Sequence, residues 1–198
     1  MSRSSLIILL SLSLLFSRAR SAPACIFCSG NPQTTVTVRM AAAQAKAVLF
    51  GTMSNPRLNP SGVGQPGSGT TQFHIEKVLK SHPLLGNRQS LEVPRYIPVD
   101  PKAPPRFVLF CDIAGNKIDA YRGMTVNSAA TLEYVRGTLV LDPRDSVRSL
   151  LFFFRYLDHT DPELANDAYI EFAKANDQQI GAVANKLAPD KLDRKSVV

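Results

Sequence analysis

The residues with the most chemical promise are two cysteines three positions apart, Cys25 and Cys28. A Cys-x-x-Cys pair can form a redox-active dithiol, half of a zinc site or a c-type haem attachment. Haem attachment requires a histidine at position 29, where the chain has Ser29. A structural zinc ion needs four ligands, and Cys111 and His74 are weak candidates for the two that the pair does not provide. The sequence therefore predicts no cofactor and no metal, and it leaves a structural disulfide and a thiol–disulfide redox site as alternatives.

The residues before this pair, 1–24, read as a secretory signal peptide. Arg3 precedes an apolar run of eleven residues, 6–16, and Ala22-Pro23-Ala24 fits the small-x-small cleavage rule. The run is too short to span a bilayer, and an uncleaved anchor is the alternative. We therefore expect a periplasmic or extracellular protein that is cleaved before Cys25 and has no membrane contact afterwards.

Export to an oxidising compartment favours the pairing of thiols, and the chain has a third cysteine, Cys111. Three cysteines cannot all pair within one chain. Either one is free, or Cys25 is lipidated at the mature N-terminus and Cys28 with Cys111 forms an even pair. We expect a disulfide from Cys111 to Cys25 or Cys28 that pins the N-terminal segment onto the fold, and a simple buried thiol is the alternative.

The charge distribution and the other motifs argue against several function classes. The formal net charge is +7, but lysines and arginines are not clustered, so we expect no nucleic-acid partner. The chain has no P-loop, no Rossmann glycine pattern and no Ser-His-Asp order. His74, His82 and His159 are scattered, and His159 is expected to close a helix. Together these patterns favour a protein that is not an enzyme and whose partner is another protein.

The elements that must position the cysteines begin with strands. Strands are expected at 47–53, 70–79, 90–96, 106–113 and 117–124. The first is almost continuously apolar, as in a strand buried on both faces, and Gly51 within it indicates a bulge. Pro94 predicts an edge position or an early stop for the third strand, and Gly115-Asn116 predicts a hairpin turn, which Asp112 and Asp119 flank. Five short strands of this kind favour a small five-stranded OB-like β-barrel.

Helical patterns flank the strands. A helix capped by Thr34 or Thr35 is expected within 31–45, and another at 129–141 with an interruption near Gly137. Asp-Pro pairs at 142–143 and 161–162 predict two further helix starts, and Asp177 is expected to cap the last helix. The apolar run 152–154 is expected to pack on the barrel, and the last helix should bury residues 180, 183, 184 and 187. Short helices joined by turns favour a HEAT-like array, with a plain helical bundle as the alternative.

We therefore expect an α+β chain with a signal peptide at 1–24, an OB-like β-barrel domain at 25–126 and a helical HEAT-like region at 127–192. The last six residues, 193–198, match one translation frame of a widely used sequencing-library adapter. They are interpreted as a sequencing artefact, so the helical region is expected to be truncated.

The motifs carry two resemblances. The Cys-x-x-Cys at 25–28, with the runs at 47–52 and 71–80, resembles the barrel of tissue inhibitors of metalloproteinases and of netrin-like modules, although those inhibitors have Cys-x-Cys. This resemblance implies protease inhibition through the N-terminal Cys25. More closely, residues 24–192 resemble a group of uncharacterised secreted bacterial proteins, some with HEAT-like helices after the barrel. The shared motifs are Arg-Phe-x-x-Phe-Cys-Asp at 106–112, Phe-Phe-x-Tyr-Leu-Asp at 153–158 and Asp-Ala-x-x-Glu-Phe-Ala at 167–173.

The sequence thus favours an exported, non-catalytic binding or scaffold protein whose ligand it does not name. One alternative is a thiol–disulfide oxidoreductase that uses Cys25 and Cys28. A second is a metalloprotease-inhibitor-like module that uses an N-terminal Cys25.

Overall fold

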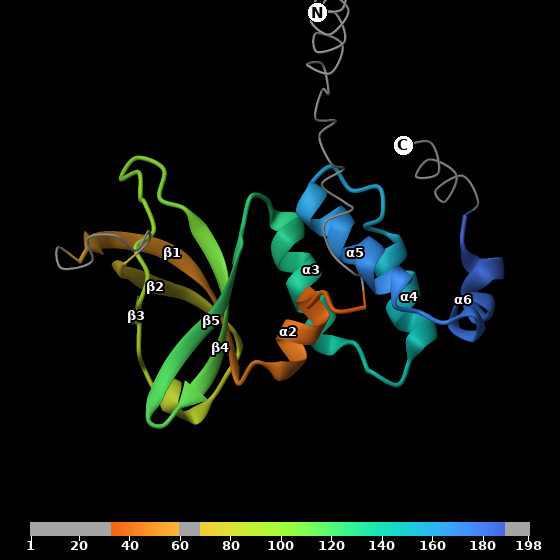
Figure 1. The fold of residues 1–198 in the computed structure, drawn as a ribbon, viewed down its shortest axis with the longest axis horizontal. Coiled ribbons are helices and arrows are strands. Elements are labelled where there is room, and N and C mark those ends of the chain that lie inside the picture. The colour runs from red at the N-terminus through yellow and green to blue at the C-terminus, as the bar shows by residue number, and fades with distance from the viewer. Residues whose placement is uncertain (1–32, 60–67, 189–198) are drawn as a thin grey trace, which may run out of the picture.

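The structure, a computed structural model, describes residues 33–59 and 68–188, and these form a mixed α+β fold. Figure 1 shows the sheet at one end of the molecule and most of the helices at the other, with helix α2 between them. The cysteine pair at 25–28 and the tail at 193–198 lie outside the described residues.

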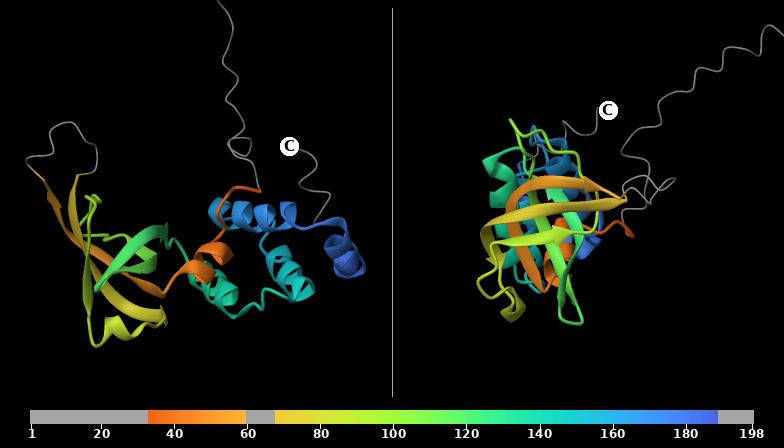
Figure 2. Two further views of the ribbon diagram at one scale, coloured as in Figure 1. Left: turned by 60° about the horizontal axis from the view of Figure 1, so that its bottom comes forward. Right: turned by 90° about the vertical axis from the view of Figure 1, so that its left-hand side faces the viewer.

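The described strands form one five-stranded antiparallel sheet with the order β3-β2-β1-β4-β5. The strands are β1 (Ala47–Leu58), β2 (Gly69–Lys80), β3 (Ser90–Val93), β4 (Arg106–Ala114) and β5 (Lys117–Thr125). All five predicted strands are present, and β3 is an edge strand that ends before Pro94. A two-residue turn joins β4 to β5, with Gly115 at φ 59°. The sheet is curled (Figure 2), but β3 and β5 remain its two hydrogen-bonding edges, so it is an open sheet.

Strand β1 is buried on both faces, as its apolar run predicted. Ala47 and Leu49 face the inside of the curl, whereas Val48 and Phe50 face the helices. Gly51 lies at a register shift between β1 and β2, where a bulge was expected. A Cβ added to Gly51 would lie 1.9 Å from the carbonyl oxygen of His74, so only glycine fits at this crossing.

The described residues also form five α-helices and two short 3₁₀ turns. The helices are α2 (Val38–Gln44), α3 (Ala129–Val140), α4 (Ser146–Phe154), α5 (Pro162–Ala173) and α6 (Asp177–Val183), and the turns are η2 (Pro83–Leu85) and η3 (Ala184–Lys186). The predicted start of α5 is confirmed, because Asp161 caps it and Pro162 is its first residue.

Three helix caps differ from the prediction. Thr37 caps α2, in place of Thr34 or Thr35, and its hydroxyl accepts from the amide of Met40. Asp145 caps α4, whereas Asp142 accepts from the amide of Arg144 in the preceding turn. The last helix, α6, is capped by Asn176 in a reciprocal capping box with Gln179, one residue before the predicted Asp177. In each case a neighbouring polar side chain fits the first-turn amide better than the predicted one.

One other helical expectation was wrong. Helix α3 continues through Gly137 without interruption, because the glycine makes room for the ring of Phe152, which lies 2.2 Å from where a Cβ would be. The expected apolar face of the last helix is largely confirmed, because Val183 and Leu187 are buried in the core and Ile180 packs against it, whereas Ala184 is exposed.

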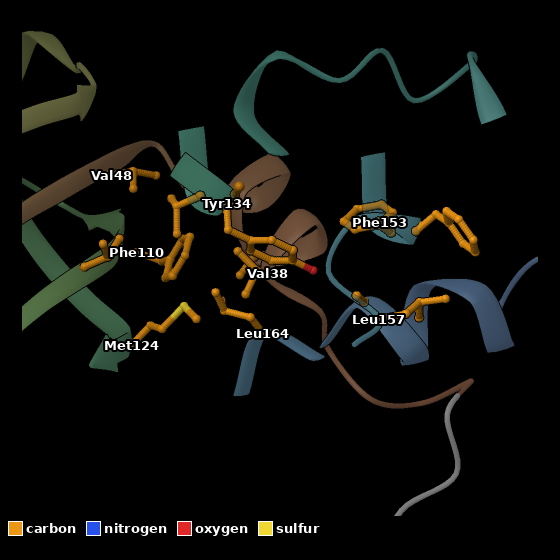
Figure 3. Close-up of a cluster of buried hydrophobic side chains, with 14 of the residues drawn as sticks. Val38, Val48, Phe110, Met124, Tyr134, Phe153, Leu157 and Leu164 are labelled. Carbon is orange, nitrogen blue, oxygen red and sulfur yellow. The ribbon is translucent and has the colours of Figure 1, made fainter. Parts of the chain in front are cut away.

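One large apolar core joins the helices to the outer face of the sheet (Figure 3). The sheet contributes Val48, Phe110 and Met124, and α3 contributes Tyr134. Helix α2 precedes the first strand in the chain, yet its buried face, with Val38, belongs to this core. The rings of the 152–154 run contact rings of the helical half and its turns, as Tyr134–Phe152, Tyr134–Phe153 and Phe154–Phe172 show.

Candidate functional site

Cys111 is the one cysteine among the described residues, and no disulfide is present among them. Its side chain is 0% exposed and lies in the cluster inside the curled sheet. Burial, and secondarily the charge of Asp119, raises the pKa of the Cys111 thiol to about 12. A thiol that stays protonated is a poor nucleophile and a poor metal ligand. The disulfide to Cys25 or Cys28 stays a prediction, and it requires residues 25–28 to reach this inner cluster.

A buried polar network fixes the N-terminal segment between the sheet and the helices. Glu171 of α5 accepts a hydrogen bond from the Thr37 hydroxyl. It also accepts two hydrogen bonds from Arg39, one from Nε at 2.9 Å and one from Nη2 at 2.7 Å. One turn earlier on α5, Asp167 accepts from the Val38 amide at 2.9 Å. We name the residues of this network the N-terminal clasp: Thr37, Arg39, Tyr134, Asp167 and Glu171.

The electrostatics of the clasp follow from its burial. Asp167 is 7% exposed and Glu171 is 4% exposed. Burial raises the pKa of Asp167, and the hydrogen bonds from Tyr134 and the Val38 amide act against that rise. Burial, with the charge of Asp167 second, raises the pKa of the Tyr134 hydroxyl, so the proton stays on the tyrosine. The clasp therefore holds two carboxylates by matched donors, which is a structural arrangement.

Sequence reasoning did not identify the clasp, although a signal for it exists. Asp167 and Glu171 are four residues apart, which places both carboxylates on one face of a helix. Leu164 and Ala168 on the same helix are fully buried. Two acids interleaved with a buried apolar face indicate carboxylates that need internal donors.

The sheet holds the other side of α2 through a bulge in β5. Phe110 pairs with Arg122 and Cys111 pairs with Ala120, so Tyr121 is the extra residue. The bulge turns both Tyr121 and Arg122 towards the N-terminal segment. The Tyr121 hydroxyl donates to the Ala41 carbonyl at 2.8 Å, and Arg122 Nη1 donates to the Val36 carbonyl at 2.8 Å.

A hollow of about 180 Å³ opens at the mouth of the curled sheet, between β5 and the segment that follows β3. Met53, Phe107 and Leu109 give it an apolar floor, and Arg95 and Tyr121 also line it. The backbone of Arg95 is fixed, because its amide donates to the Val93 carbonyl at 2.7 Å and its carbonyl accepts from the Thr71 hydroxyl at 2.8 Å. We name this hollow the sheet mouth. Its residue types suit the binding of a partner more than the chemistry of a reaction.

The histidines and the acidic pair of the hairpin have structural positions. His82 Nδ1 accepts from the Leu84 amide at the start of η2, and His159 Nδ1 accepts from the Asp161 amide before α5. The expectation that His159 closes a helix was therefore wrong, because it lies in the turn that leads into α5. Asp112 and Asp119 are register partners across β4 and β5, and both are exposed.

The described residues include neither a candidate metal cluster nor a candidate membrane helix. Within 33–59 and 68–188, no group of three histidine, cysteine, aspartate or glutamate residues is placed to hold a metal ion. In the same part of the chain, no helix combines the length and the apolar character needed to cross a membrane.

Comparison of the chain with models of known protein families and with curated proteins found no match.

Proposed function

We propose that this chain is an exported, non-catalytic binding protein and that it binds a protein partner at the sheet mouth. The observation that carries the proposal is the combination of Arg95 and Tyr121, a residue that is 42% exposed, with an apolar floor in one hollow. Tyrosine and arginine are enriched among residues that dominate protein–protein binding energies.

The chemistry of the mouth suggests the character of the partner. Arg95 offers a guanidinium with five N–H donors, which favours a carboxylate. Phe107, a half-buried residue that lines the same hollow, favours an apolar side chain. A protein segment with an acidic residue next to an apolar one therefore fits this hollow.

The proposal also covers the fold type of the sheet and of the helical region. Cα atoms of β3 and β5 come within 8 Å of one another, and Gly51 with the bulges of β2 and β5 supplies strong curvature. We propose that the curled sheet is an OB-like barrel and that the helices extend into a HEAT-like array. The resemblance to uncharacterised secreted bacterial proteins supports both points.

The test is a charge reversal in the mouth of the full-length protein, Arg95→Glu, with Arg88→Glu as the matched control. Arg88 is also exposed but does not line the mouth. Proteins from the exported fraction that the unchanged chain and the control retain, and that Arg95→Glu loses, support the proposal. Retention of the same proteins by all three forms contradicts it.

Export and signal-peptide cleavage are tested by the intact mass of the mature protein. The intact mass of the mature protein should correspond to a chain that begins at Cys25 or within a few residues of it. A protein that retains Met1 after purification from the exported fraction would contradict cleavage. The oxidoreductase and inhibitor alternatives depend on Cys25 and Cys28, and they stay predictions.

A further inference from the structure

Two hollows meet at the end of α3. One, of about 350 Å³, lies between α3 and α4, and the other, of about 520 Å³, lies between α3, α2 and the end of β2. Val140 and Leu141 line both, so the hollows are neighbours, and neither shares a residue with the sheet mouth. We name the two together the α3 hollows.

The lining of the α3 hollows is largely apolar, although it is open to solvent. Val140 is 70% exposed, which makes it the most exposed large apolar residue within 33–59 and 68–188. Six other apolar residues of the lining pack against the large core yet stay partly exposed: Leu79, Leu139, Leu141, Val147, Leu151 and Phe152. Apolar surface that gathers in this way on a soluble protein marks an interaction site, whereas scattered exposed residues do not.

The uncompensated charges of this surface are positive and lie along α4. Arg148 and Arg155 line the hollow between α3 and α4, both are exposed, and no carboxylate lies within 4.0 Å of either among the described residues. Asp145 is the one acid that the described lining contains, and its carboxylate accepts from the Arg148 amide as the cap of α4. The two guanidiniums are therefore available to carboxylates of a partner.

The cations on the α2 side are already engaged within the chain. Arg39 pairs with Glu171 at 2.7 Å, and Lys80 Nζ donates to the Ala42 carbonyl near the end of α2 at 3.1 Å. The hollow on this side thus offers its apolar lining more than free charge. The surface as a whole is apolar around the end of α3 and cationic along α4.

We propose that the α3 hollows bind an amphipathic helix of a partner protein, which carries acidic side chains beside its apolar face. Arg148 and Arg155 are seven residues apart, which corresponds to about 10 Å along a helix axis. Two acidic residues seven positions apart on the partner helix match that spacing, and its apolar face covers Val140. Two neighbouring hollows on either side of one exposed residue suit a helix better than a small molecule. This surface lies apart from the sheet mouth, so the inference does not depend on the function proposed above.

The test is a fluorescence anisotropy titration of a labelled peptide with the full chain. The peptide has about 18 residues, long enough to form a helix in isolation, with leucines on one face. Two positions beside that face, seven residues apart, are glutamate in one form of the peptide and lysine in the other. At low salt the glutamate form should bind at least about tenfold more tightly, because its charges complement the two arginines. This preference should shrink as the salt concentration rises.

Substitutions assign the binding to the α3 hollows. Val140→Asp places a charge in the apolar lining and should weaken binding of the glutamate form by about tenfold or more. The double variant Arg148→Glu with Arg155→Glu should reverse the preference, so that the lysine form binds more tightly. The matched controls are Leu58→Asp, at a residue that is 65% exposed, and Arg88→Glu, and neither residue lines these hollows. Both controls should bind the peptides as the unchanged chain does.

Four outcomes of these measurements contradict the proposal. Absence of binding at submillimolar peptide, or equal affinity for the two forms, overturns it. Loss of binding in Arg95→Glu overturns it as well, because the peptide would then lie in the sheet mouth. Binding to phosphatidylglycerol vesicles but not to the peptide, lost in Val140→Asp, would make the occupant a membrane surface. A dimer in sedimentation that Val140→Asp abolishes would make it a second copy of this chain. If circular dichroism shows that Val140→Asp is not folded, Val140→Ser applies the same test.

Discussion

Tyr134 on α3 donates a 2.7 Å hydrogen bond to Asp167 on α5, and both side chains are buried. The other oxygen of Asp167 accepts from the Val38 amide at the start of α2. One carboxylate thus joins three helices that are far apart in the chain. The hydrogen bonds of this carboxylate are the part of the clasp that mutation can test most directly.

Removing the Tyr134 hydroxyl should destabilise the protein. Tyr134→Phe leaves the ring packing in place but deprives a buried carboxylate of one donor, so the free energy of unfolding should fall by about 1–3 kcal/mol. Urea denaturation followed by circular dichroism measures the change. The control is Tyr96→Phe, because the Tyr96 hydroxyl has no hydrogen bond among the described residues. An equal loss for both variants would show that the Tyr134–Asp167 hydrogen bond contributes nothing.

Asp167 should give the stability a specific pH dependence. Burial raises its pKa in the folded chain above the unfolded value of 3.8, so the folded state holds the proton more tightly. The stability from this group is therefore complete below the unfolded pKa and is lost as the pH rises through the folded pKa. Relative to Asp167→Asn, which cannot ionise, the free energy of unfolding of the unchanged chain should decrease from about pH 4 upward. Parallel pH profiles for the two proteins would contradict the prediction.

Gly51 should not tolerate a side chain. In Gly51→Ala the new Cβ would meet the backbone of His74 at 1.9 Å, and backbone cannot move aside as a flexible side chain can. We expect a loss of at least about 3 kcal/mol in the free energy of unfolding. Gly181→Ala is the control, because Gly181 lies in α6 with open space around the added Cβ, and it should gain about 0.5–1 kcal/mol. Similar stabilities for the two variants would argue against the tight crossing of β1 and β2.

Cys111 should be unreactive in the folded protein. A fully buried thiol with a pKa of about 12 should resist alkylation by iodoacetamide at pH 8, and rapid labelling would contradict its placement. Unfolding without a reductant then tests the predicted disulfide. A blocked Cys111 supports the bond to Cys25 or Cys28, whereas full labelling shows a free buried thiol.

The sequence by itself determined the strands, because their signals are local. The apolar run at β1, the proline after β3 and the glycine of the β4–β5 turn each act on neighbouring residues, and all three predictions were confirmed. The signals that predict the helices are also local, but they did not identify the residue that caps each helix. Asp142 and Asp145 can each accept from a first-turn amide, and pattern alone does not say which one begins the helix.

Only the tertiary structure decided what those elements bring together. Tyr121 reaches α2, and Arg122 reaches the residues just before it, because one extra residue in β5 changes which face they occupy, and no periodicity shows where such a bulge falls. Glu171 meets Thr37 across 134 positions of the chain. Contacts between residues this distant depend on how whole elements pack, and for that physical reason the clasp and the sheet mouth form only in the folded chain.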